Sequence, residues 1–420
     1  MDHIIVEGGA PLHGSVEVSG AKNAALPILF STLLAPGNHR FTNVPHLKDV
    51  SSTLALLKGF NTESTLENHT AVLECKEPSN FEAHYDLVRK MRASVLCLGP
   101  LVARYGFARV SLPGGCAIGA RPINLHLDAL EKMGATIKIE QGYVEAKCKK
   151  LTGSVISFDT VTVTGTENIM MAASLAQGTT VLENAAKEPE IVNLANYLNT
   201  MGAKIKGAGN SIVTIDGVNN LRPAQISIIP DRIEAGTLLI AGAITGGEVN
   251  VKGFDPVLIK ALIQKMHEVG FQIKPLTNNS GVHLSSLKEW VSTDVTTAPF
   301  PGFATDLQAQ FMALMCVARG TSIISETIFE NRFMHVQELQ RLGADISPKT
   351  RIAVVRGKPQ GLTGAPVMAT DLRASASLVL AGLAAKGKTK INRIYHLDRG
   401  YEELEIKLQS LGAKILRGHS

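Results

Sequence analysis

The sequence predicts an α/β protein in which six repeats of about 70 residues form two domains of three repeats each. Glycines close six amphipathic segments at nearly constant spacing; they are Gly59, Gly134, Gly202, Gly270, Gly343 and Gly412. A second series has nearly the same period and comprises Gly37, Gly106, Gly178, Gly247, Gly320 and Gly387. Self-similarity at a fixed period is the signature of a repeat architecture.

Each repeat begins with an apolar segment rich in small residues, such as AALPILFSTLLAPG or GTLLIAGAITGG. A segment of this kind that ends at a glycine is typical of a helix with a glycine cap. An alternating run, for example HRFTNV or EVNVKG, follows each segment and indicates a strand. The amphipathic segment and the run after it predict a second helix and a second strand. Each repeat is therefore expected to contain helix, strand, helix and strand in this order.

Six such repeats account for nearly all of the 420 residues, and we expect three in each domain. The stretch DGVNNLRPAQISIIPDR has the proline and asparagine content of a crossover, so we place the boundary near Ile229. The stretch VEGGAPLHGSVEVSGAKNAA near the beginning of the chain resembles the start of a repeat, and we expect it to supply strands to the second half. The predicted domains are residues 22–229 and residues 1–21 plus 230–420.

Composition limits the classes of function. Hydrophobic residues make up 45% of the sequence and charged residues 19%, which excludes a disordered chain. The formal net charge of +5 is spread along the chain without a run of five like charges. This mild excess fits small acidic substrates better than a nucleic acid. No apolar stretch reaches the roughly 20 residues that span a bilayer, so we expect no membrane segment.

The first residues, MDHIIVEGG, lack the basic and apolar regions of a secretory signal. The five cysteines are odd in number and contain no CxxC pair, which argues against a disulfide framework and a zinc site. The 12 histidines contain no HxH or HxxxH pair either. We therefore expect free thiols, no metal site and a cytoplasmic protein.

Chemically informative residues recur at one position of the repeat. The residues 14 or 15 positions before the second series of glycines should start equivalent helices; they are Lys22, Arg92, Thr164, Arg232, Asp306 and Arg373. Four of these six are cations, which are unfavourable at the positive end of a helix unless an anion lies beside them. The cations are either solvated or paired at the surface, or they bind an anionic substrate between two domains. Their recurrence favours the second interpretation.

Asp306 places a carboxylate where other repeats place cations. Judged by its local sequence, it is best interpreted as the N-cap of its helix, because Asp is favoured there. If the helix starts converge, Asp306 is instead the candidate general base of a cationic site.

The segment SLPGGCAIGARP, residues 111–122, surrounds Cys116 with glycines and prolines and predicts a loop that can move. Exposure and a nearby cation, here Arg121, lower the pKa of a reactive thiol. Cys97 and Cys316 lie in apolar helical segments, where cysteine is ordinarily a packed hydrophobe. Cys116 is therefore the candidate reactive thiol, while an inert loop cysteine stays possible from local sequence alone.

GLAAKGKT, from Gly382 to Thr389, matches the phosphate-binding P-loop pattern. That pattern requires a strand, the glycine-rich loop and then a helix. The repeat places Gly387 at the end of a helix and before a strand, which is the reverse order. We therefore reject a P-loop at this position.

Motifs throughout the chain resemble the UDP-N-acetylglucosamine 1-carboxyvinyltransferase family; they are SGAKNAALPI, YDLVRKMRAS, LPGGCAIGARP, AAKEPEIV, PDRIEAGT, TDLQAQ, FENRFMHV, MATDLRASASLVLAG and YHLDRGYE. The resemblance implies a two-domain inside-out α/β barrel built from six repeats, with the active site between the domains. It also implies transfer of the enolpyruvyl group of phosphoenolpyruvate to the 3′-hydroxyl of UDP-N-acetylglucosamine, the first committed step of peptidoglycan synthesis. The implied reaction is an addition and elimination through a tetrahedral intermediate, without metal or cofactor.

The resemblance also implies roles for single residues. Cys116 matches the residue that protonates C3 of phosphoenolpyruvate and reacts with the epoxide fosfomycin, and Asp306 matches the base at the sugar hydroxyl. Lys22 and Asn23 match phosphoenolpyruvate contacts, with Arg92 as a neighbour of the substrates. The nucleotide-sugar segment corresponds to Arg121, Pro122, Ile123, Asn124 and Leu125, and Ile328 matches a residue of the sugar pocket. The carboxylate and phosphate site corresponds to Arg332, Asp371, Arg373 and Arg399.

Three positions depart from the pattern of the family. Asn124 stands where the family commonly has an aspartate, Thr160 replaces a lysine of some members, and Leu96 replaces a tryptophan. An asparagine still forms hydrogen bonds but carries no charge. We therefore expect the uridine contact to rest more on backbone groups.

Other functions fit the sequence less well. The enolpyruvyl transferase of the shikimate pathway shares the fold and the donor, but the Cys116 loop and the segment NRFMHV argue against it. An RNA-end cyclase would need a nucleotide-accepting histidine, and a polyanion-binding module would not need Asp306. We expect small-molecule substrates, and no nucleic acid, membrane or obligate protein partner.

Overall fold

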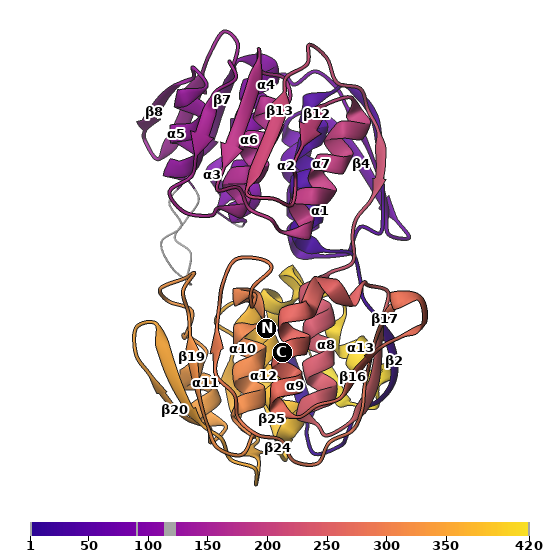
Figure 1. The fold of residues 1–420 in the computed structure, drawn as a ribbon. Helices are drawn as coiled ribbons and strands as arrows, with labels where there is room; N and C mark the ends of the chain where they lie inside the picture. The colour runs from indigo at the N-terminus through magenta and orange to yellow at the C-terminus, as the bar shows by residue number, and fades with distance from the viewer. Residues whose placement is uncertain (1, 90, 113–122, 419–420) are drawn as a thin grey trace. The chain divides into compact units, whose positions relative to one another are not determined.

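The computed structural model describes residues 2–89, 91–112 and 123–418. These residues form two compact units, each with its own apolar core (Figure 1). We call the first the Lys22 unit; its described residues are 20–89, 91–112 and 123–229. The second is the Asp306 unit, which consists of residues 2–19 and 230–418. Among the described residues, every helix is too short or too polar to pass through a membrane.

The Lys22 unit contains three four-stranded sheets, one for each of three repeats. Their strands, in spatial order, are β14 (Gln225–Ser227), β3 (Gly37–Thr42), β5 (Thr70–Cys75) and β4 (Thr62–Glu67); β6 (Glu82–Ala83), β7 (Phe107–Ser111), β9 (Tyr143–Lys147) and β8 (Thr136–Glu140); and β10 (Val155–Ser157), β11 (Thr179–Glu183), β13 (Ile212–Asp216) and β12 (Lys204–Lys206). The first strand of each sheet pairs in parallel with the second, and the remaining pairs are antiparallel.

The helices of the Lys22 unit alternate with these strands along the chain. The α-helices are α1 (Lys22–Ser31), α2 (Lys48–Gly59), α3 (Tyr85–Val88), α4 (Leu98–Tyr105), α5 (Asn124–Lys132), α6 (Val163–Ala173) and α7 (Pro189–Met201). The 3₁₀ helix η1 (Thr32–Leu34) extends α1, and the 3₁₀ helix η2 (Arg92–Cys97) directly precedes α4.

The Asp306 unit repeats the same arrangement. Its four-stranded sheets contain, in spatial order, β2 (His13–Glu17), β15 (Glu248–Lys252), β17 (Gly281–Leu284) and β16 (Ile273–Pro275); β18 (Val295–Thr296), β19 (Thr321–Ser325), β21 (Ile352–Arg356) and β20 (Asp345–Pro348); and β23 (Pro366–Met368), β25 (Lys388–Asn392), β1 (His3–Glu7) and β26 (Lys414–Gly418). A short pair joins β22 (Leu362–Thr363) to β24 (Ala385–Lys386). The start of the chain thus supplies β1 and β2 to two sheets of this unit.

The α-helices of the Asp306 unit are α8 (Arg232–Ile244), α9 (Lys260–Val269), α10 (Gln308–Met315), α11 (Val336–Arg341), α12 (Leu372–Ala384) and α13 (Leu404–Ser410). Its 3₁₀ helices are η3 (Pro256–Ile259), η4 (Thr277–Asn279), η5 (Thr305–Leu307) and η6 (Ile394–Arg399). The sequence GLAAKGKT lies where α12 ends and β24 and β25 begin, which confirms the rejection of a P-loop.

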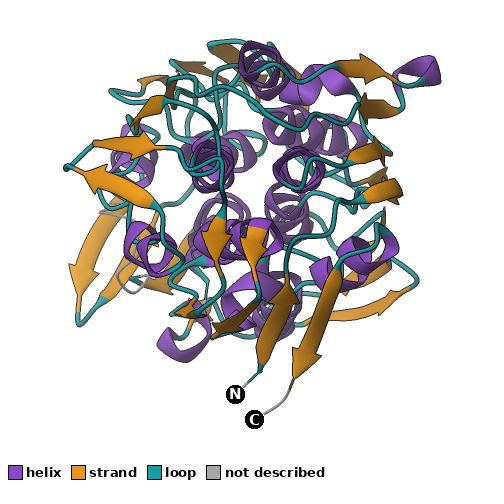
Figure 2. Ribbon diagram, turned by 90° about the horizontal axis from the view of Figure 1, so that it is seen from below, coloured by secondary structure: helices purple, strands orange, loops and turns teal. Residues whose placement is uncertain are grey.

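Helices form the interior of both units, and sheets form the outside. All 13 residues of α8 are buried, and 11 of the 13 residues of α12 are buried. The small side chains of these helices allow close packing against several neighbours. Figure 2 shows the central helices end-on, with strands towards the rim. This arrangement confirms the predicted α/β fold with buried helices.

Two details of the predicted repeat were wrong. Two strands were predicted for each repeat, but each repeat contributes to a sheet of four strands. Edge strands of two or three residues, such as β6 and β18, are too short to show the alternation that predicts a strand. Within the second series of glycines, only Gly106 directly caps a helix, in the left-handed conformation at φ 74°. The other glycines of that series follow their helices after further residues of turn or strand.

Candidate active site

The six residues predicted to start equivalent helices do so in the structure. Lys22, Arg92 and Arg232 are the first residues of α1, η2 and α8. Thr164, Asp306 and Arg373 are the second residues of α6, η5 and α12. The glycine spacing therefore located the start of the buried helix in every repeat.

Asp306 lies between two buried guanidinium groups of the Asp306 unit. Nη2 of Arg332 donates to Oδ1 over 2.8 Å, and Nη2 of Arg373 donates to Oδ2 over 2.9 Å. The side chains of Arg332 and Arg373 are 3% and 4% exposed, whereas that of Asp306 is 26% exposed. The N-cap interpretation of Asp306 is wrong, because Ala304 is the N-cap of η5 and no side chain caps this helix.

This arrangement suits a base that must stay ionised. Two neighbouring cations favour the charged form of a carboxylate. An ionised carboxylate offers about four acceptor positions, so the two guanidinium bonds do not exhaust its capacity. Burial disfavours the charged form of Arg373, but the Asp306 carboxylate, with smaller contributions from Tyr401 and Asp231, outweighs it, and the pKa of Arg373 lies above its ordinary value.

A buried polar cluster contacts both Arg373 and the backbone of Asp306. The ring of Tyr401 lies under the guanidinium of Arg373, 5.3 Å from ring centre to Cζ. Nε2 of Gln310 lies 3.1 Å from the hydroxyls of Tyr401 and Thr237, and it donates to the backbone carbonyl of Asp306 over 2.8 Å. Burial raises the pKa of Tyr401, which keeps its hydroxyl protonated. Gln310 and Tyr401 thus connect the core to the base and to one of its arginines.

Asp371 caps the N-terminus of α12. Its Oδ1 accepts hydrogen bonds from the backbone N–H groups of Arg373 and Ala374, over 2.9 and 3.1 Å. Asp371 is therefore the N-cap that fixes the backbone from which Arg373 projects. His335 is buried nearby, and burial lowers its pKa to about 4 although the Asp371 carboxylate opposes this shift.

The two other residues predicted for the Asp306 unit are Ile328 and Arg399. Ile328 is half-buried, and its backbone N–H donates to Oε1 of Glu326 over 2.7 Å. Arg399 is the last residue of η6 and is half-buried.

Lys22 of the Lys22 unit is held by a buried carboxylate. Its Nζ lies 2.7 Å from Oδ2 of Asp49, and the two side chains are 13% and 3% exposed. Asp49 is in the first turn of α2, where the helix dipole also favours a negative charge. Asn23 follows Lys22 in α1 and is half-buried. A carboxylate thus lies beside the cation at the start of α1, as Asp306 does beside Arg373.

Arg92 lies close to a buried histidine, His126 of α5. Burial, and to a smaller extent the charge of Arg92, lowers the pKa of His126 to about 3. Of the predicted nucleotide-sugar segment, Ile123 is buried, Leu125 is half-buried, and Asn124 is exposed as the first residue of α5. Cys116, Arg121 and Pro122 lie outside the described residues.

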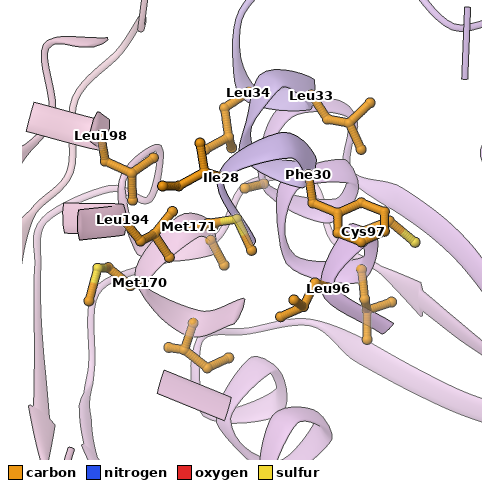
Figure 3. Close-up of a cluster of buried hydrophobic side chains, with 14 of the residues drawn as sticks. Ile28, Phe30, Leu33, Leu34, Leu96, Cys97, Met170, Met171, Leu194 and Leu198 are labelled. Carbon is orange, nitrogen blue, oxygen red and sulfur yellow. The ribbon is translucent and has the colours of Figure 1, made fainter. Parts of the chain in front are cut away.

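The four described cysteines are free thiols, as predicted. Figure 3 shows Cys97 among the apolar side chains of α1, η2, α6 and α7 that form the core of the Lys22 unit. Burial raises the pKa of Cys97 far above its ordinary value and that of Cys316 to about 12. Both are packed hydrophobes, as their apolar segments predicted.

The structure therefore brings Asp306, Arg332 and Arg373 into direct contact, and Asp371 accepts a hydrogen bond from the backbone N–H of Arg373. Sequence reasoning missed Asp49, Gln310 and Tyr401, which hold these residues. No spacing in the sequence pointed to them. Asp49 contacts a residue of the preceding α-helix, Tyr401 contacts residues far away along the chain, and Gln310 contacts both Tyr401 and the carbonyl of Asp306.

Three kinds of comparison place the chain among known proteins. A family model described as EPSP synthase (3-phosphoshikimate 1-carboxyvinyltransferase) matches residues 6–408. The chain is 64% identical over 414 residues to a UDP-N-acetylglucosamine 1-carboxyvinyltransferase of Bdellovibrio bacteriovorus, covering 99% of this chain and 100% of the relative. It is 57% identical over 421 residues to a protein of the same name from Myxococcus xanthus, covering 99% of both chains.

Solved structures share the fold. The enolpyruvyl transferase NikO from Streptomyces tendae superposes with a TM-score of 0.88 at 24% identity, covering 100% of this chain and 99% of the other. An EPSP synthase from Acinetobacter baumannii superposes with a TM-score of 0.77 at 17% identity, covering 100% of both chains. At these identities the likeness shows the fold, and it confirms the expected enolpyruvyl transferase architecture.

Proposed function

Because the chain belongs to the EPSP synthase family, and within it to the UDP-N-acetylglucosamine 1-carboxyvinyltransferases, we propose that it transfers an enolpyruvyl group. The donor is phosphoenolpyruvate, the acceptor is the 3′-hydroxyl of UDP-N-acetylglucosamine, and phosphate is released. The observation that carries the proposal is the Asp306 carboxylate between Arg332 and Arg373, in a chain 64% identical over nearly its full length to an enzyme of that name.

Asp306 is the proposed base of the addition step. It accepts the proton of the sugar hydroxyl while the hydroxyl oxygen forms a bond to C2 of phosphoenolpyruvate. The C2–C3 double bond breaks at the same time, and Cys116 supplies a proton to C3. The product of this step is a tetrahedral intermediate in which C2 carries both the sugar oxygen and the phosphate.

Elimination completes the reaction. The bond from C2 to the phosphate oxygen breaks, the Cys116 thiolate takes back a proton from C3, the double bond forms again, and the proton on Asp306 leaves with the phosphate. Phosphate and the enolpyruvyl ether of the nucleotide sugar are the products, so atoms and charges balance without an oxidant or a reductant.

The cations have a shared role in the proposal. Phosphoenolpyruvate carries a carboxylate and a phosphate, and we assign these groups to Lys22, Arg332, Arg373 and Arg399, with Arg92 as a neighbour of the substrates. The planar guanidinium groups of arginine suit both anions because they form paired hydrogen bonds. Such preorganised charges stabilise the negative charge that develops during transfer.

The remaining residues bind the acceptor or position the cations. We assign the nucleotide sugar to Arg121, Pro122, Ile123, Asn124 and Leu125, with Ile328 at the sugar ring. Asn23 is a further phosphoenolpyruvate contact. Asp371 acts through Arg373, since it caps the helix that carries this arginine.

The proposal extends to location and partners. Both substrates carry phosphate charges, so we expect the reaction in the cytoplasm as an early step of peptidoglycan synthesis. Small-molecule substrates are sufficient for this chemistry, and we propose no nucleic acid, membrane or obligate protein partner.

Release of phosphate from phosphoenolpyruvate tests the proposal. The assay is run in EDTA with UDP-N-acetylglucosamine, with shikimate 3-phosphate and without an acceptor. We expect release with UDP-N-acetylglucosamine alone. Release only with shikimate 3-phosphate would move the chain to the other branch of its family, and a strict need for metal or ATP would contradict the mechanism.

A further inference from the structure

A buried carboxylate outside the predicted site binds two of its segments at once. Glu326 directly follows β19 and is 1% exposed. A carboxylate in such a place destabilises the fold unless hydrogen bonds replace its water. The two oxygens of Glu326 accept four hydrogen bonds, from two side chains and two backbone N–H groups.

One oxygen fixes the segment that contains Ile328. Oε1 accepts from the backbone N–H groups of Ile328 and Phe329, over 2.7 and 3.2 Å, and from Oγ1 of Thr297 over 2.9 Å. These bonds determine the backbone conformation directly after Glu326. We call this set of contacts the sugar arm, since Ile328 is the proposed contact of the sugar ring.

The other oxygen fixes the segment that contains Asp306. Oε2 accepts from Oγ1 of Thr305 over 2.9 Å, and Thr305 directly precedes Asp306. The backbone carbonyl of Thr305 also accepts from Nη2 of Arg332 over 3.3 Å, and Arg332 in turn donates to Asp306. We call the contact with Thr305 the base arm.

We infer that Glu326 is a positioning residue that couples the base Asp306 to the sugar contact Ile328. This inference rests on the proposed function, since it concerns the placement of the acceptor hydroxyl against its base. Glutamate suits this role because an ionised carboxylate only accepts, and all four neighbours are donors. A shift of either segment by about 1 Å is enough to lower a rate of transfer strongly.

Three variants of the full chain separate the two arms. Thr305→Val keeps the shape of the side chain but removes the base arm, so we expect kcat to fall about tenfold while the KM for UDP-N-acetylglucosamine stays within about twofold. Glu326→Ala removes both arms, so we expect the same loss of kcat together with a rise of about tenfold in this KM.

Glu326→Gln is the conservative variant. Backbone N–H groups cannot accept, so the amide oxygen must stay on the sugar arm and the NH₂ group must face Thr305. The hydroxyl of Thr305 can accept from that group. Both arms therefore persist, and we expect kcat and KM to return to within about threefold of the natural protein.

Thr321→Val is the matched control, because Thr321 is exposed on β19, the strand that leads to Glu326. Thermal unfolding of each variant is measured beside the kinetics, which are run well below the melting temperature. Unchanged kcat and KM in Thr305→Val and Glu326→Ala, with a lower melting temperature, would show that Glu326 only stabilises the fold. A Glu326→Gln variant as impaired as Glu326→Ala would also overturn the inference.

Phosphate release by the natural protein shows whether only the role of Glu326 is wrong or the proposed function is wrong as well. If it releases phosphate with UDP-N-acetylglucosamine while Thr305→Val and Glu326→Ala match it, only the role of Glu326 falls. If it releases no phosphate with that acceptor, the proposed function falls and the role of Glu326 falls with it.

Discussion

Arg373 donates a hydrogen bond to Asp306 over 2.9 Å, although 67 residues separate them in the sequence. Each starts a helix at the equivalent position of a different repeat, Asp306 in η5 and Arg373 in α12. The repeat thus places a carboxylate and a cation at matching helix starts, where they meet. This pair, together with Arg332, is the part of the site with the most direct structural support.

Replacing the base tests the chemical role of Asp306. Asp306→Asn keeps the shape of the side chain but removes its capacity to accept a proton, so we expect kcat to fall by about 10²-fold to 10⁴-fold. Binding of UDP-N-acetylglucosamine, measured by calorimetry, should persist. Asp86→Asn is a suitable control because the Asp86 side chain is 82% exposed in the other unit. A rate equal to that of the natural protein would remove the role of base from Asp306.

The buried pair of Lys22 and Asp49 predicts a loss of both stability and donor binding. Asp49→Asn removes a negative charge beside a lysine that is only 13% exposed, so we expect the free energy of unfolding to fall by about 3 kcal/mol. The KM for phosphoenolpyruvate should rise because the position of Lys22 is no longer fixed.

Urea unfolding and phosphate release measure these two effects. The control is Glu63→Gln, which breaks the exposed pair of Glu63 and Lys58 and should cost less than about 1 kcal/mol. Equal losses of stability in both variants would contradict the importance of the buried pair.

Buried histidines predict that the protein loses stability in mild acid. Burial lowers the pKa of His126 to about 3, so this side chain stays neutral in the folded protein while the unfolded chain binds a proton below about pH 6.5. Its contribution is complete above pH 6.5 and is lost as the pH falls towards 3. The resulting slope is at most about 1.4 kcal/mol per pH unit for one histidine.

His126→Gln removes this titration, so its free energy of unfolding should fall less steeply between pH 6.5 and 4 than that of the natural protein. Denaturant unfolding at a series of pH values measures the slope. His84→Gln, at a side chain that is 63% exposed, should keep the natural slope. The same slope in His126→Gln would show that other groups cause the acid sensitivity.

The cysteines predict selective alkylation by the epoxide fosfomycin. Burial raises the pKa of Cys97, Cys148 and Cys316, so their thiols stay protonated at neutral pH and react slowly. Cys116 lies in a glycine-rich segment next to Arg121, and we expect the adduct on this residue. Peptide mass spectrometry locates the adduct. An adduct on Cys97 or Cys316 would refute the assignment.

Features that repeat along the chain could be predicted from the sequence. Each buried helix ends near a glycine that recurs once in every repeat, so the starts of these helices, including Lys22 and Arg373, followed from counting. The order of elements around GLAAKGKT followed from the same period. Such features depend on local conformation, which neighbouring residues determine.

Features that depend on contacts between segments distant in the sequence could not be predicted in this way. The local sequence favoured Asp306 as a helix cap, because nothing near it reveals that Arg332 and Arg373 approach its carboxylate. The same holds for Asp49 beside Lys22 and for Glu326 beside Thr305. These partners come together only when the helices and loops pack.

The fate of one oxygen atom tests most directly whether the protein transfers an enolpyruvyl group. Phosphoenolpyruvate labelled with ¹⁸O in the bridge between C2 and phosphorus is incubated with the protein and UDP-N-acetylglucosamine, and both products are analysed by mass spectrometry. Addition and elimination break the bond between C2 and this oxygen, so we predict label in the phosphate and an unlabelled enolpyruvyl ether of the nucleotide sugar. Label retained in pyruvate or in the nucleotide sugar, with unlabelled phosphate, would contradict enolpyruvyl transfer.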